Sequence, residues 1–250
     1  MYEATISIPT KYNYLLHHIE NRISPFCKQV GGVSIMHEDK YRRYYSVACC
    51  DIYASMVKRM AVGSVSEVLC VGYKNIFLRD LLEVSNQDFY TDVLINTMCL
   101  FDSKQDKIFV SKMIDITQPI FLDGYYHFKM QDIKEKWKDI CKLLEENYFI
   151  VGDTELTLEF LQYLLQSIDN RCKHLSILME KDAFYLFGTD NKAIRPVHCI
   201  AKNNVIEQDA MQNILYLNPQ KVVVYCKQRP SDEFVYMTEK LFDTSFVVKE

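Results

Sequence analysis

The run Val222–Tyr225, in which every side chain is apolar, constrains the fold more than any other stretch of the chain. A strand that is apolar at every position is buried on both faces, as in parallel sheets covered by helices. Amphipathic segments on either side predict those helices: Ile206–Leu217, which ends at Asn218-Pro219, and Asp232–Leu241. A last strand is predicted over Ser245–Val248. The order helix, strand, helix, strand predicts parallel strand pairing in this region.

The N-terminal region predicts a small β-α-β unit. Glu3–Ile8 alternates polar and apolar residues, as a half-buried strand does. Tyr12–Ile23 repeats apolar residues along one helical face, and Tyr44–Ile52 is rich in residues that favour strands. After the break at Gly31-Gly32, Val33–His37 is a candidate hairpin partner for that second strand.

Between residues 53 and 171 apolar residues recur with the period of helices. The clearest helices are Lys129–Glu146 and Thr154–Asp169, and Asp153 or Thr154 can cap the start of the second. The stripe of the second includes Ile168. Other predicted helices are Tyr53–Met60, Ser66–Val71, Asn75–Leu82, Phe89–Phe101 and Lys107–Ile114. After residue 172, Leu175–Met179 and Ala183–Phe187 have the pattern of strands.

These patterns predict an α/β chain, α+β overall, of three regions or of one continuous fold. The regions are an N-terminal α/β unit at 1–52, a helical region at 53–171, and a C-terminal α/β unit with a partly parallel sheet at 172–250.

Composition excludes several classes of protein. The net charge of −4 argues against a general nucleic-acid coat, which needs an excess of Lys and Arg. The N-terminus lacks a targeting signal and no apolar run is long enough to span a membrane, so we expect a soluble, cytoplasmic protein. Its nine cysteines are odd in number and lie mostly in apolar runs, which favours reduced thiols. Seven glycines and the absence of phosphate-binding motifs argue against a nucleotide cofactor, and we expect no cofactor.

Two other constellations are weak. Cys172 and His174 with His198 and Cys199 supply zinc-type ligands, but they lack ligand spacing, so no metal site is predicted. Asp182 with Asp190-x-Lys192 is similar to the acidic pair and lysine of metal-dependent nucleases. Turn formation alone explains Asp190, and it is the favoured interpretation.

The basic pair Arg42-Arg43 lies among tyrosines, and Arg42, Arg43 and Tyr45 are candidate nucleic-acid-binding residues. Arginines and aromatic rings can neutralise and stack on a single strand. A solvated strand face is the favoured interpretation because the chain is acidic overall. Lys58-Arg59 and the lysines of the helix at residues 129–146 are read in the same way.

A second candidate site follows the apolar strand. Ligands of α/β sheets bind outside the carboxyl ends of the strands, which places a crevice at Cys226–Pro230. Lys227 and Arg229 are the side chains best placed to bind an anionic ligand there. A plain connecting loop with solvated charges is the competing, favoured interpretation.

The segment Phe121–Ile133 resembles a motif of the YtxC-like family of sporulation proteins, Gly-aromatic-x-x-Phe-Arg-Leu-Lys-x-Tyr. Here Lys129 replaces the Arg and Ile133 replaces the Tyr. The resemblance covers residues 121–226, including Thr154–Leu165 and Gln212–Tyr225. It implies a role in sporulation in a Gram-positive, spore-forming bacterium, and it carries over no catalytic residue.

We therefore expect a non-enzymatic interaction or accessory protein with a protein partner. The alternative is a nucleic-acid-binding or metal-dependent nuclease-like protein that uses the C-terminal α/β unit. The aromatic strip Phe121–Phe128 is expected to be partly buried and to anchor the helix that follows, with Phe128 a candidate core residue.

Overall fold

The computed structural model describes residues 1–84, 88–147, 152–167, 172–202 and 205–248. They form two compact units that the chain enters more than once. Unit 1 comprises residues 1–77, 102–139 and 200–202, and unit 2 comprises 78–101, 140–199 and 203–250. The helices expected over 53–171 are thus divided between the two units. Each unit contains a mixed sheet with a parallel strand pair, which confirms the α/β fold class.

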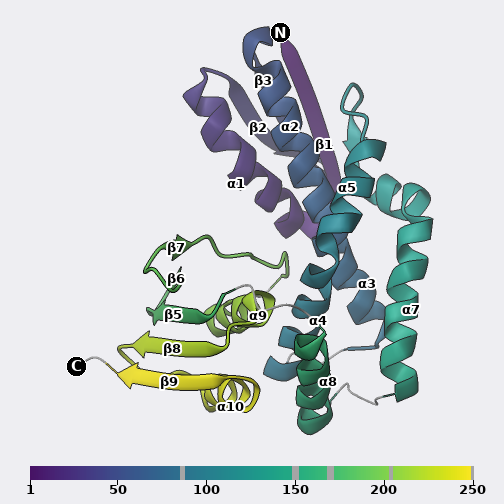
Figure 1. Ribbon diagram of the computed structural model, residues 1–250. Helices are drawn as coiled ribbons and strands as arrows, with labels where there is room; N and C mark the ends of the chain where they lie inside the picture. The colour runs from purple at the N-terminus through teal and green to yellow at the C-terminus, as the bar shows by residue number, and fades with distance from the viewer. Residues whose placement is uncertain (85–87, 148–151, 168–171, 203–204, 249–250) are drawn as a thin grey trace. The chain divides into compact units, whose positions relative to one another are not determined.

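Unit 1 is built on a sheet with the strand order β2-β3-β1-β4. Strands β1 (Tyr2–Pro9) and β2 (Val33–Glu38) both pair antiparallel with β3 (Arg42–Cys49). The short β4 (Ile120–Phe121) pairs parallel with β1. Helix α1 (Asn13–Gln29) packs on one face of this sheet (Figure 1). The predicted strands, helix and hairpin are all present, and a short 3-10 turn at Thr10–Tyr12 leads into α1.

The turn from α1 into β2 depends on two glycines. The N–H of Gly32 donates to the carbonyl of Cys27 at 2.8 Å, and that of Gly31 donates to Lys28 at 3.1 Å. This pair of bonds is a Schellman motif, in which the residue after the helix takes a left-handed conformation. Gly31 has a φ of +71°. A side chain on Gly32 would meet Cys27 Sγ at 2.6 Å and the carbonyl oxygen of Ala48, on β3, at 2.7 Å.

The helices predicted at Tyr53–Met60, Ser66–Val71 and Asn75–Leu82 form one continuous helical run. It consists of α2 (Asp51–Glu67), a π-helical turn at Val68–Gly72 and α3 (Tyr73–Leu81). Every residue of the π turn is buried. Gly72 permits this packing because a Cβ there would lie 2.5 Å from Leu15 of α1. The gaps between the three predicted helices are therefore not loops, because the helix continues through them and changes type at the π turn.

The aromatic strip Phe121–Phe128 corrects one expectation. After β4 it forms α6 (Leu122–Gly124) and a second π turn at Tyr125–Lys129, which leads to α7 (Gln131–Asn147). Phe128 is 84% exposed and is not a core residue. The widened turn directs Phe128 outward while Tyr126 stacks on Tyr73, with ring centroids 4.6 Å apart. Leu122, which is fully buried, anchors the strip instead.

A polar cluster lies among the helices of unit 1. Trp137 of α7 is fully buried and donates its indole N–H to Asp106 of α5 (Ser103–Met113) at 3.0 Å. Lys74 is also fully buried, and it forms an ion pair with Asp102. Its ammonium lies 5.7 Å from the centre of the Trp137 ring. Burial raises the pKa of Asp106, and the hydrogen bond from Trp137 opposes that rise. Met130, Ile133 and Cys141 are buried with Trp137 along one face of α7.

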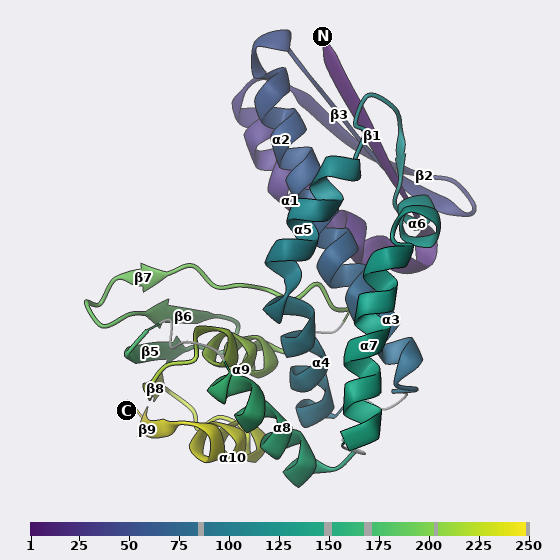
Figure 2. The ribbon, with the colours of Figure 1, turned by 45° about the vertical axis from the view of Figure 1, so that its right-hand side comes forward.

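Unit 2 contains a sheet with the strand order β7-β6-β5-β8-β9. The predicted apolar strand is β8 (Lys221–Cys226), and it lies in the interior between two parallel neighbours, β5 (His174–Met179) and β9 (Asp243–Val248). This confirms the expectation for Val222–Tyr225. Strands β6 (Phe184–Phe187) and β7 (Ala193–Ile194) extend the sheet antiparallel. The unit also contains α8 (Thr154–Gln166), α9 (Ile206–Leu217) and α10 (Asp232–Leu241) (Figures 1 and 2).

Helix α4 (Phe89–Phe101) packs against α8, α9 and α10 of unit 2. All residues from Thr91 to Leu100 are buried, including the polar ones. Asp92 accepts hydrogen bonds from Arg79 at 2.6 Å and from Gln208 of α9 at 3.0 Å. Buried polar groups need such partners, so these bonds fix α4 against α9.

The predicted cap of α8 is confirmed. Asp153 accepts hydrogen bonds from the backbone N–H groups of Glu155 and Leu156, at 3.0 and 3.1 Å. The helix was predicted to continue to Asp169, but it ends at Gln166, and Ile168 and Asp169 lie outside the described residues. Within the described part of the chain, no helix combines the length and the apolar character needed to cross a membrane.

Candidate functional site

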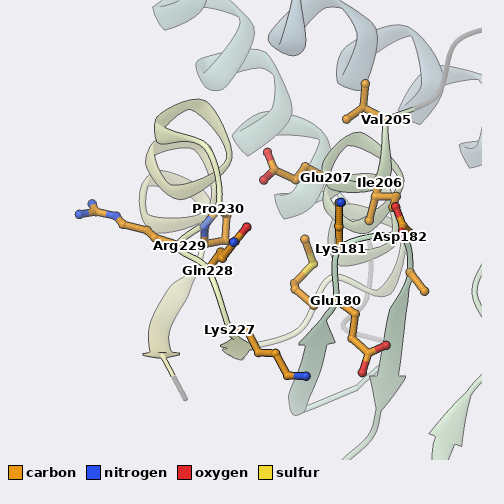
Figure 3. A pocket seen from close by; sticks show the side chains of 12 residues that line it. Glu180, Lys181, Asp182, Val205, Ile206, Glu207, Lys227, Gln228, Arg229 and Pro230 are labelled. Atoms are coloured by element: carbon orange, nitrogen blue, oxygen red, sulfur yellow. The ribbon is translucent and has the colours of Figure 1, made fainter. Parts of the chain in front are cut away.

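A pocket with a volume of about 770 Å³ lies at the carboxyl ends of β5 and β8 in unit 2 (Figure 3). The two strands end level with each other, because Met179 pairs with Cys226 in the parallel register. Three segments line the pocket: the turn after β5, the start of α9 and the loop after β8. The lining residues are Met179, Glu180, Lys181, Asp182, Ala183, Val205, Ile206, Glu207, Lys227, Gln228, Arg229 and Pro230.

The turn after β5 is a tight hairpin. The N–H of Glu180 donates to the carbonyl of Ala183 at 2.8 Å, which leaves Lys181 and Asp182 at the tip. Both tip residues are exposed. Because β6 then runs back antiparallel to β5, the charged tip stays at the carboxyl end of the parallel strands.

Glu207 connects α9 to α10. Its carboxylate accepts a hydrogen bond from the backbone N–H of Ser231 at 3.0 Å and another from the Ser231 hydroxyl. The same hydroxyl accepts from the N–H of Phe234 at 3.3 Å and so caps α10. A carboxylate at this position is favoured because a helix N-terminus carries partial positive charge. Glu207 therefore holds the loop after β8 in place.

Three cations line the pocket without ion-pair partners among the described residues. Lys181, Lys227 and Arg229 are all exposed, and none forms a salt bridge. In Figure 3 the side chain of Arg229 extends away from the other labelled side chains, toward solvent. The apolar lining comes from five residues, of which Met179 and Pro230 are buried; the others are Ala183, Val205 and Ile206. The pocket thus combines an apolar floor with unpaired positive charge at its rim.

The expected crevice at Cys226–Pro230 is therefore a pocket, and both Lys227 and Arg229 line it. Sequence reasoning missed Glu180, Lys181 and Glu207. The same rule about strand ends could have found the first two, because they follow the predicted strand Leu175–Met179. No sequence signal pointed to Glu207, whose partner Ser231 is 24 positions away.

The nuclease-like set is not assembled. Asp182 lines the pocket before β6, whereas Asp190 follows the end of β6 and lies outside the lining. Asp190 pairs with Lys192 at 3.6 Å, and both side chains are largely exposed. The turn interpretation explains them better, since the N–H of Gly188 donates to the Lys192 carbonyl and Asn191 has a φ of +54°.

The basic cluster of β3 does not form one surface. Arg42 and Arg43 point to opposite faces of the strand, as neighbouring strand residues do. Arg42 makes a two-pronged contact with Asp123, with one bond of 3.0 Å, and these hydrogen bonds lower the pKa of Asp123. Arg43 pairs with Glu38.

Tyr45 is wrongly predicted as a stacking residue. Its side chain is fully buried beneath α1, and its hydroxyl lies 3.1 Å from that of Ser24. The face of β3 that carries Tyr45 is the one that α1 covers. A base cannot reach the ring.

The four residues considered as zinc ligands, Cys172, His174, His198 and Cys199, do not form a ligand set either. His174 begins β5, at the end opposite the pocket. His198 Nδ1 lies 3.4 Å from Asp209 Oδ2 on α9, whereas the side chain of Cys199 is buried. Among the described residues, no three His, Cys, Asp or Glu side chains converge on a point that could hold a metal ion.

Comparison with known proteins gave no match: none of the protein-family models, the curated proteins or the solved structures is similar to this chain.

Proposed function

We propose that this chain is an accessory protein that binds a small organic anion in the pocket at the carboxyl ends of β5 and β8. The observation that carries the proposal is the set of unpaired cations, Lys181, Lys227 and Arg229, at the rim of a pocket with an apolar floor. A volume of about 770 Å³ lies within the range of small-molecule sites.

The charge pattern narrows the ligand class. Glu207 is held by Ser231 at the start of α10, so its carboxylate is already hydrogen-bonded. Glu180 and Asp182 are exposed and would repel a highly charged anion. A ligand with one or two negative groups and an apolar or planar body fits these surroundings best. The negative group would contact the lysines, the body would lie on Met179 and Ile206, and Arg229 would add positive charge at the outer rim.

We propose binding rather than catalysis because of exposure. Catalytic acids and bases are usually tuned by burial and by a close charged partner. Glu180, Lys181 and Asp182 are exposed, as are Lys227 and Arg229. Such groups suit the capture of an anion, which needs charge at the rim and little change of protonation.

Thermal unfolding with defined probes tests the site. We expect AMP, which joins one phosphate to a planar base, to raise the melting temperature of the wild-type chain more than the more highly charged citrate and pyrophosphate do, because a ligand at 100 times its Kd stabilises by about 2.7 kcal/mol. The variant K227E/R229E should lose this shift. The matched control K173E/K192E reverses two exposed charges in the same unit, outside the pocket, and should keep it. A wild-type chain that none of the probes stabilises, or equal shifts in both variants, would contradict the anion site.

The nucleic-acid alternative is one outcome of the same experiment. A short single-stranded oligonucleotide should not bind more tightly than AMP if the pocket takes one small anion. Tighter binding that weakens steeply with salt would favour the alternative, because contacts to several phosphates release counterions.

A role in sporulation, implied by the resemblance of residues 121–226 to the YtxC-like family, also stays a proposal, as does a protein partner. Deletion of the gene followed by counts of heat-resistant spores tests the role. An organism that forms no spores, or a deletion that leaves the counts unchanged, would contradict it.

A further inference from the structure

Strand β2 is an open edge of the unit 1 sheet, with its only strand neighbour among the described residues being β3. Its side chains alternate between the face beneath α1 and the opposite face. Val33 and Ile35 lie on the opposite face, and each is 57% exposed. An exposed, apolar strand edge favours pairing with another strand.

The hydrogen-bond pattern shows which backbone groups of β2 are free. The N–H of Asp39 donates to the carbonyl of Arg42 at 2.9 Å, so this pair closes the hairpin. In an antiparallel ladder, hydrogen-bonded and non-hydrogen-bonded pairs alternate from that point. The alternation directs the backbone groups of Val33, Ile35 and His37 toward β3. The backbone N–H and C=O groups of Ser34 and Met36 point the other way in the plane of the sheet, away from β3.

The edge lacks the usual protection against pairing. Edge strands are commonly protected by proline, by lysine or by a bulge. The sequence of β2, Val-Ser-Ile-Met-His-Glu, contains neither proline nor lysine. Its register with β3 is regular from Val33 to Glu38, without a bulge.

We propose that β2 pairs antiparallel with β2 of a second copy of this chain, with Ile35 opposite Ile35 at the twofold axis. In this register Ser34 of one copy and Met36 of the other exchange their outward N–H and C=O groups. Val33 then lies opposite His37, so apolar and aromatic side chains cover the junction. The two sheets become one continuous sheet.

Charge complementarity favours a second copy over an unrelated strand. The antiparallel register brings the hairpin end of one copy, with Glu38, beside Gly32 of the other. Lys28 lies one helical turn before Gly32, at the exposed end of α1, and is the basic residue of the last turn. Each end of the junction therefore brings a lysine of one copy to the Glu38 carboxylate of the other, which also pairs with Arg43 of its own copy through Oε2.

Light scattering coupled to size-exclusion chromatography tests the pairing. We expect twice the chain mass for the wild type at micromolar concentration. Ile35→Lys should give the chain mass, because it places two lysines opposite each other at the axis. The matched control Ile52→Lys, on α2 and 80% exposed in the wild type, should remain dimeric. A wild type that is monomeric at every concentration, or an Ile35→Lys variant that stays dimeric, would overturn the proposal.

Cross-linking tests the register and does not depend on a destabilising charge. Ile35→Cys should form a covalent dimer on mild oxidation, because opposite Cα atoms in a non-hydrogen-bonded pair are only about 4.5 Å apart. His37→Cys is the control, since its twofold mate would lie about 14 Å away at about 3.4 Å per residue. Equal cross-linking of both variants, or none of Ile35→Cys, would contradict this register. A monomer that instead captures an unrelated extended peptide would overturn the choice of a second copy.

Discussion

Asp106 illustrates how a single hydrogen bond retains a charged side chain in a helical core. It is only 6% exposed, and its partner is the indole N–H of Trp137. Burial raises its pKa above the ordinary value of 3.8. The folded state therefore binds a proton more tightly than the unfolded state does. This carboxyl contributes stability at low pH and loses that contribution as the pH rises through its folded pKa.

We expect Asp106→Asn to be less costly than Asp106→Leu. The asparagine keeps an acceptor for Trp137 and carries no charge, so its stability relative to the wild type should increase as the pH is raised from about 4 to 7. The leucine leaves the buried indole N–H unsatisfied, which costs about 1–3 kcal/mol. Urea unfolding at several pH values measures both. A stability difference between Asp106→Asn and the wild type that does not change with pH would contradict the raised pKa.

Exposure predicts a small effect of Phe128→Ala. Because Phe128 is 84% exposed, the free energy of unfolding should change by no more than about 0.5 kcal/mol. Leu122→Ala in the same strip should cost about 2–5 kcal/mol, since Leu122 is fully buried. Thermal unfolding of both variants checks this, and a large effect of Phe128→Ala would show that the ring is covered in solution.

The elements of this protein are joined by turns whose chemistry is local. The turn from α1 into β2 shows it best, because Gly31 and Gly32 have different roles. Gly31 supplies the left-handed conformation, with a φ of +71° and no atom within 4 Å of the place that a Cβ would take. Gly32 instead lets β2 approach α1 and β3 closely.

We expect Gly32→Ala to destabilise more than Gly31→Ala. An alanine at 32 would collide with Cys27 Sγ and with the backbone carbonyl of Ala48, and overpacking of this kind costs about 1–3 kcal/mol. An alanine at 31 meets no neighbour and should cost about 1 kcal/mol for its left-handed backbone. Gly31→Asn should be milder still. Unfolding midpoints in urea rank the three variants, and the reverse order would contradict the Schellman geometry.

Strands and capped helices could be predicted from sequence because their signals are local. Phe89–Phe101 and Ile206–Leu217 have the predicted bounds, and Val222–Tyr225 was correctly placed inside a parallel sheet. The π turns could not be predicted, because a widened turn such as Val68–Gly72 has no residue signature of its own. The prediction that Phe128 lies in the core was wrong for the same reason, because Phe128 is part of the π turn at Tyr125–Lys129.

Part of the candidate site could likewise be predicted from the sequence, and part could not. Lys227 and Arg229 were predictable from the rule that ligands bind beyond strand ends. Glu207 was not, because its place depends on how α9 packs against the loop before α10. The prediction for Tyr45 was wrong because the face of β3 that α1 covers is decided by tertiary packing, which the local sequence does not show.

At the scale of the whole molecule, the chain order interleaves the two units. Residues 78–101 leave unit 1 to form α4 of unit 2, and the chain then returns to unit 1 at residue 102. A cut between the units at any single peptide bond therefore leaves one of them incomplete. The fragment 1–139 would contain all of unit 1 except residues 200–202, together with α4 without α8, α9 and α10.

We expect the fragment 1–139 to lack a cooperative unfolding transition and to bind a hydrophobic dye. The reason is that all residues of α4 from Thr91 to Leu100 are buried in the full chain, so without α8, α9 and α10 the helix exposes its apolar side chains. Circular dichroism melting and dye fluorescence measure both properties, with the full chain as control. A soluble fragment that melts sharply and binds no dye would show that unit 1 tolerates α4 in water.

The interleaved chain order also determines which helices are uncovered while the chain is being synthesised. Helix α4 leaves the ribosome before the helices that cover it, and α9 is complete only at Leu217. At about 5–20 residues per second, the nascent chain carries an uncovered apolar helix for on the order of ten seconds. Such a helix is a natural ligand for the chaperones that meet emerging chains. The most vulnerable period of this protein therefore falls before translation ends, when slower elongation between residues 101 and 217 would lengthen the exposure.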